Sequence, residues 1–476
     1  MSLISVDPRA SRTPDDPRAP LGRMARLLDD GSMVVMDSGS DSSVRTARGR
    51  IDGVEVVVYG TDPRRKGGAL AAPDADRIVH AIFYARRWDC PVIGLWHSGG
   101  AALTDGVESM EGVGRMFSAM TEASGRIPQI SVVLGPAAGA AAYGPGLTDI
   151  VIMSRAGKMF ITGPQVVRSV TGEEIDLDGL GGAEAHGSRS GVVHLAVPDE
   201  GHALDAARRL TGYLSHRGHF TPDEGQGRDL RSLLPESARR AYDVRPLVHA
   251  LFDVEAGRLR FDELQPRWAP NLVIGLGRLG GGSVGVLANN PLRKGGCLDS
   301  LASEKAARFV RMCDAFGIPL LVIVDVPGYL PGVDQEWGGV IRRGAKLLHA
   351  FAGAVVPRVT LVTRKSYGGA YIAMNSRSLG AATVFAWPSA EIAVMGAEAA
   401  VGVLHRDQLA GATAQELPRL RARLEQEFRA VSGGVDRAAD LGAVDEVIDP
   451  ASTRRRLVEA FAAAAPARGR HDNIPL

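Results

Sequence analysis

The sequence predicts an α/β protein in which one fold occurs twice. At 476 residues the chain is too long for one ordinary core and suits two domains of roughly 200 residues each. Short runs rich in β-branched residues, bounded by Gly, Pro or charge, alternate with amphipathic stretches, as is typical of α/β units. The segment RKGGAL at 65–70 returns as RKGGCL at 293–298, which indicates an internal repeat.

The expected elements follow from local patterns. Strands are predicted at 54–59, 92–96, 130–134, 284–288, 320–326 and 359–362. Amphipathic helices are predicted at 74–87 and 303–316. In the second helix Ala307, Val310 and Asp314 follow helical spacing, and Ser303 marks its expected start.

The repeat extends beyond its first six residues. Four further matches keep the same order: 90–93 with 318–321, Glu108 with Glu336, 127–128 with 356–357, and 139–141 with 369–371. The offset between the copies grows only from 228 to 230 residues, so insertions are few. Ordered matches at equivalent strand and helix positions predict a duplicated fold.

The chain is expected to comprise four segments. Residues 1–20 are rich in Pro, Asp and Arg and predict a flexible N-terminal arm. Two domains are expected at 21–225 and 243–476, joined by a polar, Pro-containing linker at 226–242.

Composition indicates a soluble globular protein of the cytoplasm. Hydrophobic residues make up 45% and charged residues 23%, and the formal net charge of +1 predicts no basic surface for nucleic acid or membranes. Three scattered cysteines suit reduced thiols better than a disulfide framework. The first 20 residues lack the apolar core of a secretory signal, and no apolar run reaches the ~18 residues of a membrane span.

Each half of the chain carries two turns of small residues. In the first half they lie at 66–69 and 135–140, and in the second half at 294–297 and 366–370. Small residues let backbone N–H groups approach an oxygen closely, and a helix N-terminus adds the positive end of its dipole. Two such turns facing each other would form an oxyanion hole for an enolate. The alternative is that these glycines only permit tight packing of strand against helix.

Longer motifs resemble those of one enzyme family. They are SEKAARFVR at 303–311, DVPGYLPG at 325–332, TRKSYGGAY at 363–371, AWPSAEIAVMG at 386–396 and HDNIPL at 471–476, with weaker matches at 105–109, 126–131 and 160–164. Together they resemble the carboxyltransferase (β) subunits of propionyl- and acetyl-CoA carboxylases. The resemblance covers about residues 20 to 476 and is most specific in the second half.

The resemblance implies two tandem crotonase-like domains and a biotin-dependent reaction. In this family carboxybiotin supplies the carboxyl group, and the biotin ureido nitrogen removes the α-proton of an acyl-CoA. That chemistry fits a sequence without a Ser-His-Asp triad, a metal-ligand cluster or a necessary pair of catalytic carboxylates. We therefore expect no metal in this subunit. His97 and His186 are expected to be structural or to line the pocket, because the reaction needs no imidazole.

Site residues carried over by the resemblance fall into three groups. The thioester oxygen is expected to be held by Gly139 and Ala140, with Gly68 and Ala69 facing them. The biotin ureido oxygen is expected to be held by Gly369 and Ala370, with Gly296 and Cys297 facing them. Expected substrate contacts are Tyr143, Gly99, Gly100, Tyr371, Ile372, Arg64, Arg65 and Lys66, of which the last three would contact CoA phosphates or form an exposed turn.

The resemblance also implies partners. The chain has no Met-Lys-Met biotinylation motif, so biotin is expected on a separate α subunit that carries the biotin carboxylase and the biotin carboxyl carrier. Family members form homohexamers, as trimers of dimers, with sites between subunits, and a small accessory subunit is a further candidate partner. We expect no nucleic-acid or membrane partner.

The first half departs from the family pattern. Family members usually carry Asp-Ser-Gly-Gly-Ala-Arg where this chain has His97 to Ala102, and Ala140 replaces a glycine. Ala102 thus stands where the family carries an arginine, and another residue can seldom replace an arginine in a site. The sequence therefore leaves open which acyl-CoA is used. It also leaves open whether the reaction runs as a decarboxylation, and whether the chain is a silent paralogue that scaffolds a carboxylase.

Overall fold

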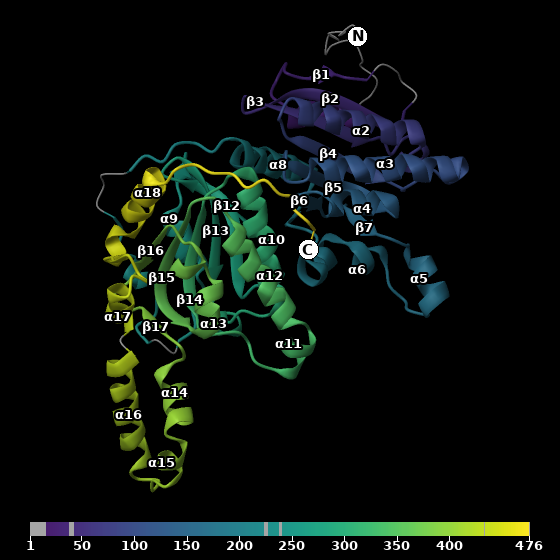
Figure 1. The fold of residues 1–476 in the computed structure, drawn as a ribbon. Helices are drawn as coiled ribbons and strands as arrows, with labels where there is room; N and C mark the ends of the chain where they lie inside the picture. Colours follow the sequence, from purple (N-terminus) through teal and green to yellow (C-terminus); the bar gives the residue numbers. More distant parts are fainter. Residues whose placement is uncertain (1–15, 38–41, 223–226, 238–239, 433, 476) are drawn as a thin grey trace. The chain divides into compact units, whose positions relative to one another are not determined.

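The computed structural model describes residues 16–37, 42–222, 227–237, 240–432 and 434–475. The chain divides into two compact units (Figure 1). Unit 1 takes the described residues up to Arg217 together with 264–268 and those from Gly469 onward, and unit 2 takes 218–263 and 269–468. Most of the expected N-terminal arm, residues 1–15, lies outside the described residues.

Unit 1 contains an eight-stranded sheet. Its order is β1-β2-β3-β4-β5-β6-β8, with β7 paired to β5. An antiparallel hairpin of β2 and β3 leads into parallel β4, β5, β6 and β8. The strands are β1 Val34–Val35, β2 Val44–Ile51, β3 Val54–Thr61, β4 Val92–Ser98, β5 Gln129–Ala138, β6 Ile150–Ser154, β7 Lys158–Phe160 and β8 Leu195–Val197.

Helices cover both faces of this sheet. Trp96 is buried in a cluster with apolar residues of the helices α2 Ala72–Arg87 and α3 Val107–Ala123. Successive strand residues point to opposite faces, and Leu95 accordingly lies near Met24 of the helix α1 Pro20–Leu27. The remaining helices are α4 Ala140–Gly146, α5 Pro164–Thr171, α6 Leu177–Gly181, α7 Ala183–Ala185 and α8 Glu200–Ser215, with short turns η1 Lys66–Gly68, η2 Leu103–Asp105 and η3 His186–Ser190.

Unit 2 repeats this design. Its sheet has the order β11-β12-β13-β14-β15-β16-β18, with β17 paired to β15, and a separate hairpin joins β9 Val254–Glu255 to β10 Arg258–Leu259. The sheet strands are β11 Phe261–Leu264, β12 Leu272–Leu279, β13 Gly282–Asn289, β14 Leu320–Val326, β15 Arg358–Tyr367, β16 Thr383–Ala386, β17 Glu391–Ala393 and β18 Glu446–Val447.

The helices of unit 2 include a layer beside this sheet and a helical extension at its end (Figure 1). The extension consists of α14 Ala397–Leu404, α15 Arg406–Ala410 and α16 Leu417–Ser432. The other elements are α9 Arg245–Leu251, α10 Ser300–Phe316, α11 Val333–Trp337, α12 Val340–Gly353, α13 Gly368–Ala373, α17 Gly434–Asp440 and α18 Thr453–Ala463, with η4 Leu230–Leu233, η5 Lys294–Gly296, η6 Arg377–Leu379 and η7 Pro450–Ser452.

The two sheets share their register. Val57 pairs with Val92 in unit 1, and Gly285 pairs with Leu320 in unit 2, both 228 residues further on. Each central strand pair also has a register shift at the same place. The duplicated α/β fold predicted from the sequence is therefore confirmed.

Each unit is held together by an equivalent ion pair. Asp29 accepts hydrogen bonds from two backbone N–H groups at the β2–β3 turn, and Asp253 accepts two at the β12–β13 turn. Arg208 of α8 pairs with Asp29, and Arg454 of α18 pairs with Asp253, each at 2.7 Å. Each aspartate thus links the antiparallel hairpin of its unit's main sheet, β2–β3 or β12–β13, to the last helix of that unit.

Most predicted elements are confirmed. The six predicted strands lie within β3, β4, β5, β13, β14 and β15, and the two predicted helices lie within α2 and α10. The predicted start of the second helix at Ser303 is wrong, because α10 begins at Ser300 and the side chain of Asp299 accepts a hydrogen bond from Ala302 N at 2.8 Å.

Several segments differ from the expected boundaries, among them 264–268, which belongs to unit 1. Part of the expected linker at 226–242 packs into unit 2, where Leu230 and Tyr242 are buried in the core. The C-terminal residues, expected in the second domain, pack in unit 1: buried Asn473 donates from Nδ2 to Asp149 Oδ1 at 2.7 Å. The tail is held by hydrogen bonds and has no strand or helix of its own, which explains why no periodic pattern indicated its place.

Candidate functional site

Each unit contains a strand, a glycine turn and a short helix at the same place in its sheet. Strand β5 runs through Gly139 into α4, and β15 runs through Gly368 into α13. Both glycines have positive φ, +54° and +59°, a conformation that residues with a Cβ rarely adopt. The short strands β7 and β17 support this equivalence: the residue before each glycine pairs with the last residue of its short strand, Ala138 with Phe160 and Tyr367 with Ala393.

This correspondence corrects the alignment of the repeat. Gly139 is equivalent to Gly368, not to Gly369 as the sequence matches suggested, because the offset at this turn is 229 and not 230. Ala140 is therefore equivalent to Gly369, and Tyr143 is equivalent to Ile372. An added Cβ at Gly369 would contact no heavy atom within 4 Å, so Ala140 fits the same turn without strain.

Each short helix presents a backbone donor in its first turn. The N–H of Gly139 is already used, since it donates to Phe160 O at 2.9 Å. Ala140 is the first residue of α4 and Gly369 the second of α13, and N–H groups in a first turn have no partner within their own helix. We therefore assign the accessible donors of these turns to Ala140 and Gly369, while Ala370 is buried behind the second one.

The turns expected to face these donors are occupied by their own hydrogen bonds. Gly68 N donates to Arg65 O at 2.8 Å, and Ala69 N donates to Lys66 O at 3.2 Å. The second unit repeats the pattern, with Gly296 N bonded to Arg293 O and Cys297 N bonded to Lys294 O. In this structure the N–H groups of all four residues therefore make hydrogen bonds within their own turns.

Residues 98–101 lie between the two turns of unit 1. Gly99 N donates to Gly67 O at 2.9 Å, and an ideal Cβ at Gly100 would lie 2.6 Å from Ala138 O. Gly100 O and Ala102 N both bond to Leu70, at 2.8 Å each. Successive peptide groups of an extended chain point in opposite directions, so the N–H of Ala101 points away from Leu70 toward the β5 side.

The second unit has the same arrangement at Tyr329. Leu298 N donates to Gly328 O at 3.1 Å, and Leu330 N donates to Leu298 O at 2.7 Å, which turns the N–H of Tyr329 toward the β15 side. Sequence reasoning did not include Ala101 and Tyr329 among the candidate donors. The repeat offset of 228 aligns Gly100 with Gly328, so the sequence could have indicated that the residues after these glycines are equivalent.

The expected substrate-contacting side chains lie at the exposed side of the helices. Tyr143 is 55% exposed and packs edge-on against Phe117, with ring centroids 6.2 Å apart, and Ile372 is 44% exposed. Tyr371 is half-buried, and burial raises the pKa of its hydroxyl.

The basic turn before Gly67 is only partly available for an anionic ligand. Arg64 forms an ion pair at 2.7 Å with the buried carboxylate of Asp62. Lys66 is exposed, and its φ is +47°. In unit 2 its counterpart Lys294 forms an ion pair with Asp299.

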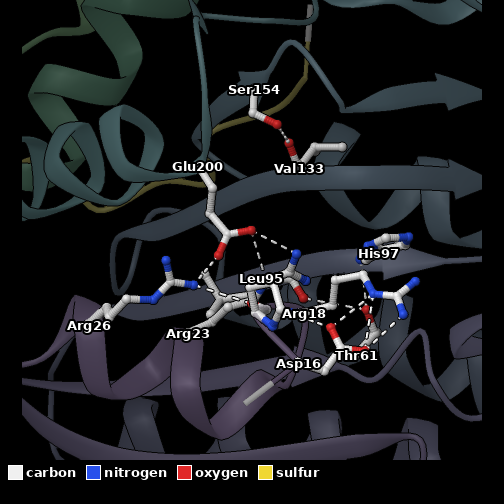
Figure 2. A network of polar contacts seen from close by, with 11 residues as sticks. Asp16, Arg18, Arg23, Arg26, Thr61, Leu95, His97, Val133, Ser154 and Glu200 are labelled. Carbon is white, nitrogen blue, oxygen red and sulfur yellow. Dashed lines mark hydrogen bonds and ion pairs between the residues drawn. The ribbon is translucent and has the colours of Figure 1, made fainter. Parts of the chain in front are cut away.

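Neither histidine near the turns is set up as a general base. Burial, with smaller contributions from Arg23 and Arg18, lowers the pKa of His97 to about 4, and Figure 2 shows the polar groups gathered beside it. His186 has both ring nitrogens in hydrogen bonds, to Met159 O at 2.7 Å and Ser190 Oγ at 2.8 Å. Burial raises the pKa of the Cys297 thiol, so this group is not an activated nucleophile.

The described residues can also be compared with the requirements of a metal site and of a membrane span. Its His, Cys, Asp and Glu residues form no group of three or more that could hold a metal ion. None of its helices is both long and apolar enough to cross a membrane.

Comparisons with known proteins identify one family. A model of the carboxyl transferase domain matches residues 30–472. The beta6 subunit of the biotin-dependent acetyl-/propionyl-coenzyme A carboxylase of Mycobacterium tuberculosis is 58% identical over 463 residues, covering 97% of each chain. The propionyl-CoA carboxylase beta chain of Rhodococcus erythropolis is 54% identical and covers 98% of each chain.

A solved structure extends the likeness to the fold. The transcarboxylase 12S hexamer, with methylmalonyl-coenzyme A and methylmalonic acid bound, superposes with a TM-score of 0.88 at 40% identity. The match covers 96% of this chain and 92% of that one.

Proposed function

This chain belongs to the carboxyl transferase domain family, and from that premise we propose that it carboxylates the α-carbon of a short acyl-CoA such as acetyl- or propionyl-CoA. It acts as the carboxyltransferase (β) subunit of a biotin-dependent acyl-CoA carboxylase. One observation supports the proposal: an ideal Cβ at Gly100 would lie 3.8 Å from Ala140 N, so the first turn of α4 lies close to the extended loop of unit 1, and we infer the same pairing of Gly369 with the Tyr329 loop in unit 2.

Paired N–H donors suit the two oxygens of this reaction. We propose that Ala140 and Ala101 of unit 1 hold the thioester oxygen, which becomes an enolate oxygen when the α-proton leaves. Gly369 and Tyr329 of unit 2 would hold the ureido oxygen of biotin. Fixed N–H groups stabilise developing charge strongly in a site that excludes water, and one such donor contributes about 10²- to 10³-fold in kcat.

The residues present fit a cofactor that supplies the reactive groups. When bound, carboxybiotin supplies both the carboxyl group and the base. The chain would bind and orient: Tyr143 and Ile372 would contact the bound molecules at the exposed faces of α4 and α13. The exposed ammonium of Lys66 would attract a CoA phosphate.

We propose that a separate biotin-bearing subunit completes the enzyme. The chain has no Met-Lys-Met motif, and the beta6 relative is named as one subunit of a biotin-dependent carboxylase. The partner would be an α subunit with the biotin carboxylase and carrier domains, and a small accessory subunit could join it. We further propose a homohexamer, a trimer of dimers, because the 12S relative is described as a hexamer.

The test is carboxylation with labelled bicarbonate, ATP and a biotin-bearing α subunit. We expect label in malonyl-CoA or methylmalonyl-CoA, lost when the α subunit or ATP is omitted. The beta6 relative in the same assay is the positive control. Release of CO2 from malonyl-CoA without ATP, in the absence of forward labelling, would instead establish a decarboxylase. If this chain shows no turnover in either direction while the control is active, the remaining hypothesis is a silent paralogue that scaffolds a carboxylase.

A further inference from the structure

The two units differ at one equivalent point beside their proposed oxyanion sites. In unit 1 the pairing of β4 with β5 jumps from Trp96–Val133 to Ser98–Ala137, so β5 carries two extra residues opposite His97. In unit 2 the pairing jumps from Val324–Val362 to Val326–Ser366, and Asp325 lies opposite the extra residues. Such a bulge bends a strand and changes the direction of the residues after it.

In unit 2 a buried ion pair fills this bulge. Asp325 accepts a hydrogen bond from Arg364 Nε at 2.9 Å and another from the backbone N–H of Lys365 at 3.3 Å. The carboxylate therefore accepts from an N–H that is not paired in the β14–β15 ladder. The guanidinium also donates to Ser237 O and lies over the ring of Tyr242.

In unit 1 all three of these residues are replaced together. The counterparts of Asp325, Arg364 and Lys365 are His97, Gly135 and Pro136. An ideal Cβ at Gly135 would lie 2.5 Å from the imidazole of His97, so the ring occupies the space that a side chain at 135 would need. Pro136 has no N–H, so this bulge needs no carboxylate acceptor. Packing of a ring on glycine thus replaces the ion pair.

The surroundings keep this ring neutral at physiological pH. Burial is the main cause of the lowered pKa of His97, Arg23 and Arg18 add to it, and Glu200 and Asp16 oppose it. Arg23 is itself buried and donates to Glu200 at 2.7 Å (Figure 2). The backbone N–H of His97 donates to Thr61 Oγ1 at 2.8 Å, which fixes the residue to β3.

We propose that His97 is a positioning residue for the acyl side of the site, holding the 98–101 loop and its Ala101 N–H against the end of β5 through its contact with Gly135. The inference rests on the proposed function for its kinetic consequence. The residue after His97 also links two site loops, because Ser98 Oγ donates to Gly68 O at 2.6 Å. Loss of the ring would free Gly135 and let the donor at Ala101 shift.

The test is a double-mutant cycle with His97→Ala and Gly135→Ala in the full chain with its biotin-bearing partner. A misplacement of about 1 Å can cost 10²-fold in rate, so we expect His97→Ala to lower kcat with acyl-CoA about tenfold or more. The KM for the biotin-bearing partner should stay within about twofold, since that side is held by Asp325 and Arg364. Gly135→Ala should be similarly impaired, because its Cβ meets the ring.

Rescue separates a contact between 97 and 135 from general damage. In the double variant the added Cβ enters the space the ring has left, so kcat should exceed that of Gly135→Ala alone. His202→Ala is the matched control, because this histidine lies at the exposed start of α8. Activity of that variant within about twofold of wild type is expected.

Amide hydrogen exchange gives a readout that needs no turnover. We expect faster exchange in peptides covering 97–103 of His97→Ala and no change in peptides covering 325–331. Unchanged exchange, or additive effects of the two substitutions, would overturn the inference. An inactive wild-type chain would refute the proposed function instead, and exchange would still decide whether His97 holds the loop.

Discussion

Arg364 donates from Nε to a carboxylate oxygen of Asp325 at 2.9 Å, and the two side chains are only 9% and 1% exposed. Burial raises the pKa of Asp325, while the guanidinium opposes that rise. A buried carboxylate without a cation is costly, because the charge loses its hydration and gains nothing in return. The pair is therefore a point where a single substitution has a large effect.

Arg364→Met should lower the free energy of unfolding by about 3–5 kcal/mol, because it leaves the carboxylate of Asp325 buried and unpaired. Asp325→Leu combined with Arg364→Met should cost less than Arg364→Met alone, because the stranded charge is gone. Denaturant unfolding measures both. Arg26→Ala is the control: this side chain is 49% exposed, so losing its pairing with Glu200 should cost no more than about 1 kcal/mol.

Because Lys305 of unit 2 is fully buried, the free energy of unfolding should depend on pH in the alkaline range. Lys305 Nζ donates to Leu272 O at 2.8 Å, and burial lowers its pKa to about 7. Between about pH 7 and its unfolded pKa of about 10.4, the unfolded chain binds more protons at this residue, so stability should rise with pH there. We expect Lys305→Met to lack this rise of up to about 1.4 kcal/mol per pH unit. Near pH 10, where burial of the neutral lysine costs little, the variant should unfold more easily than wild type, because Leu272 O has lost its donor. Parallel plots of unfolding free energy against pH for the two proteins, from pH 7 to 10, would contradict the assignment.

The proposed oxyanion donors can be removed without removing a side chain that contacts substrate. Proline in the first turn of a helix is well tolerated, and its main chemical change here is loss of the N–H. Ala140→Pro and Gly369→Pro should each lower kcat about 10²- to 10³-fold while melting close to the wild-type temperature. Ala141→Ser, one residue into α4, serves as the control for perturbing that helix. Full activity in either proline variant would show that its N–H is not a donor in the reaction.

Much of this architecture could be predicted from the sequence, because duplication leaves matched glycines, prolines and strand patterns. Details that depend on backbone hydrogen bonds could not. Gly68 and Ala69 were predicted to face the donors of α4, yet their N–H groups bond to Arg65 O and Lys66 O within the same turn, which no sequence pattern indicates. Likewise the equivalence of Gly139 with Gly368 follows from strand register. Sequence identity alone paired Gly139 with Gly369, one residue further along the chain.

The preference among acyl-CoA substrates tests whether Ile372 of unit 2 contacts the acyl group. We propose, from the family resemblance alone, that Asp at position 372 would favour propionyl-CoA and that the apolar Ile372 of this chain allows broader use. Ile372 is 44% exposed on α13, available for a ligand at that surface. One methylene in an apolar pocket is worth about 1–3 kcal/mol, so preference among acetyl-, propionyl- and butyryl-CoA should be graded. We expect Ile372→Asp to shift their relative kcat/KM values while biotin-dependent turnover persists. Tyr143→Phe, at the equivalent place in unit 1, tests whether the effect belongs to that position in both units. An identical ratio of kcat/KM across the three substrates in Ile372→Asp and wild type would place Ile372 outside the acyl pocket.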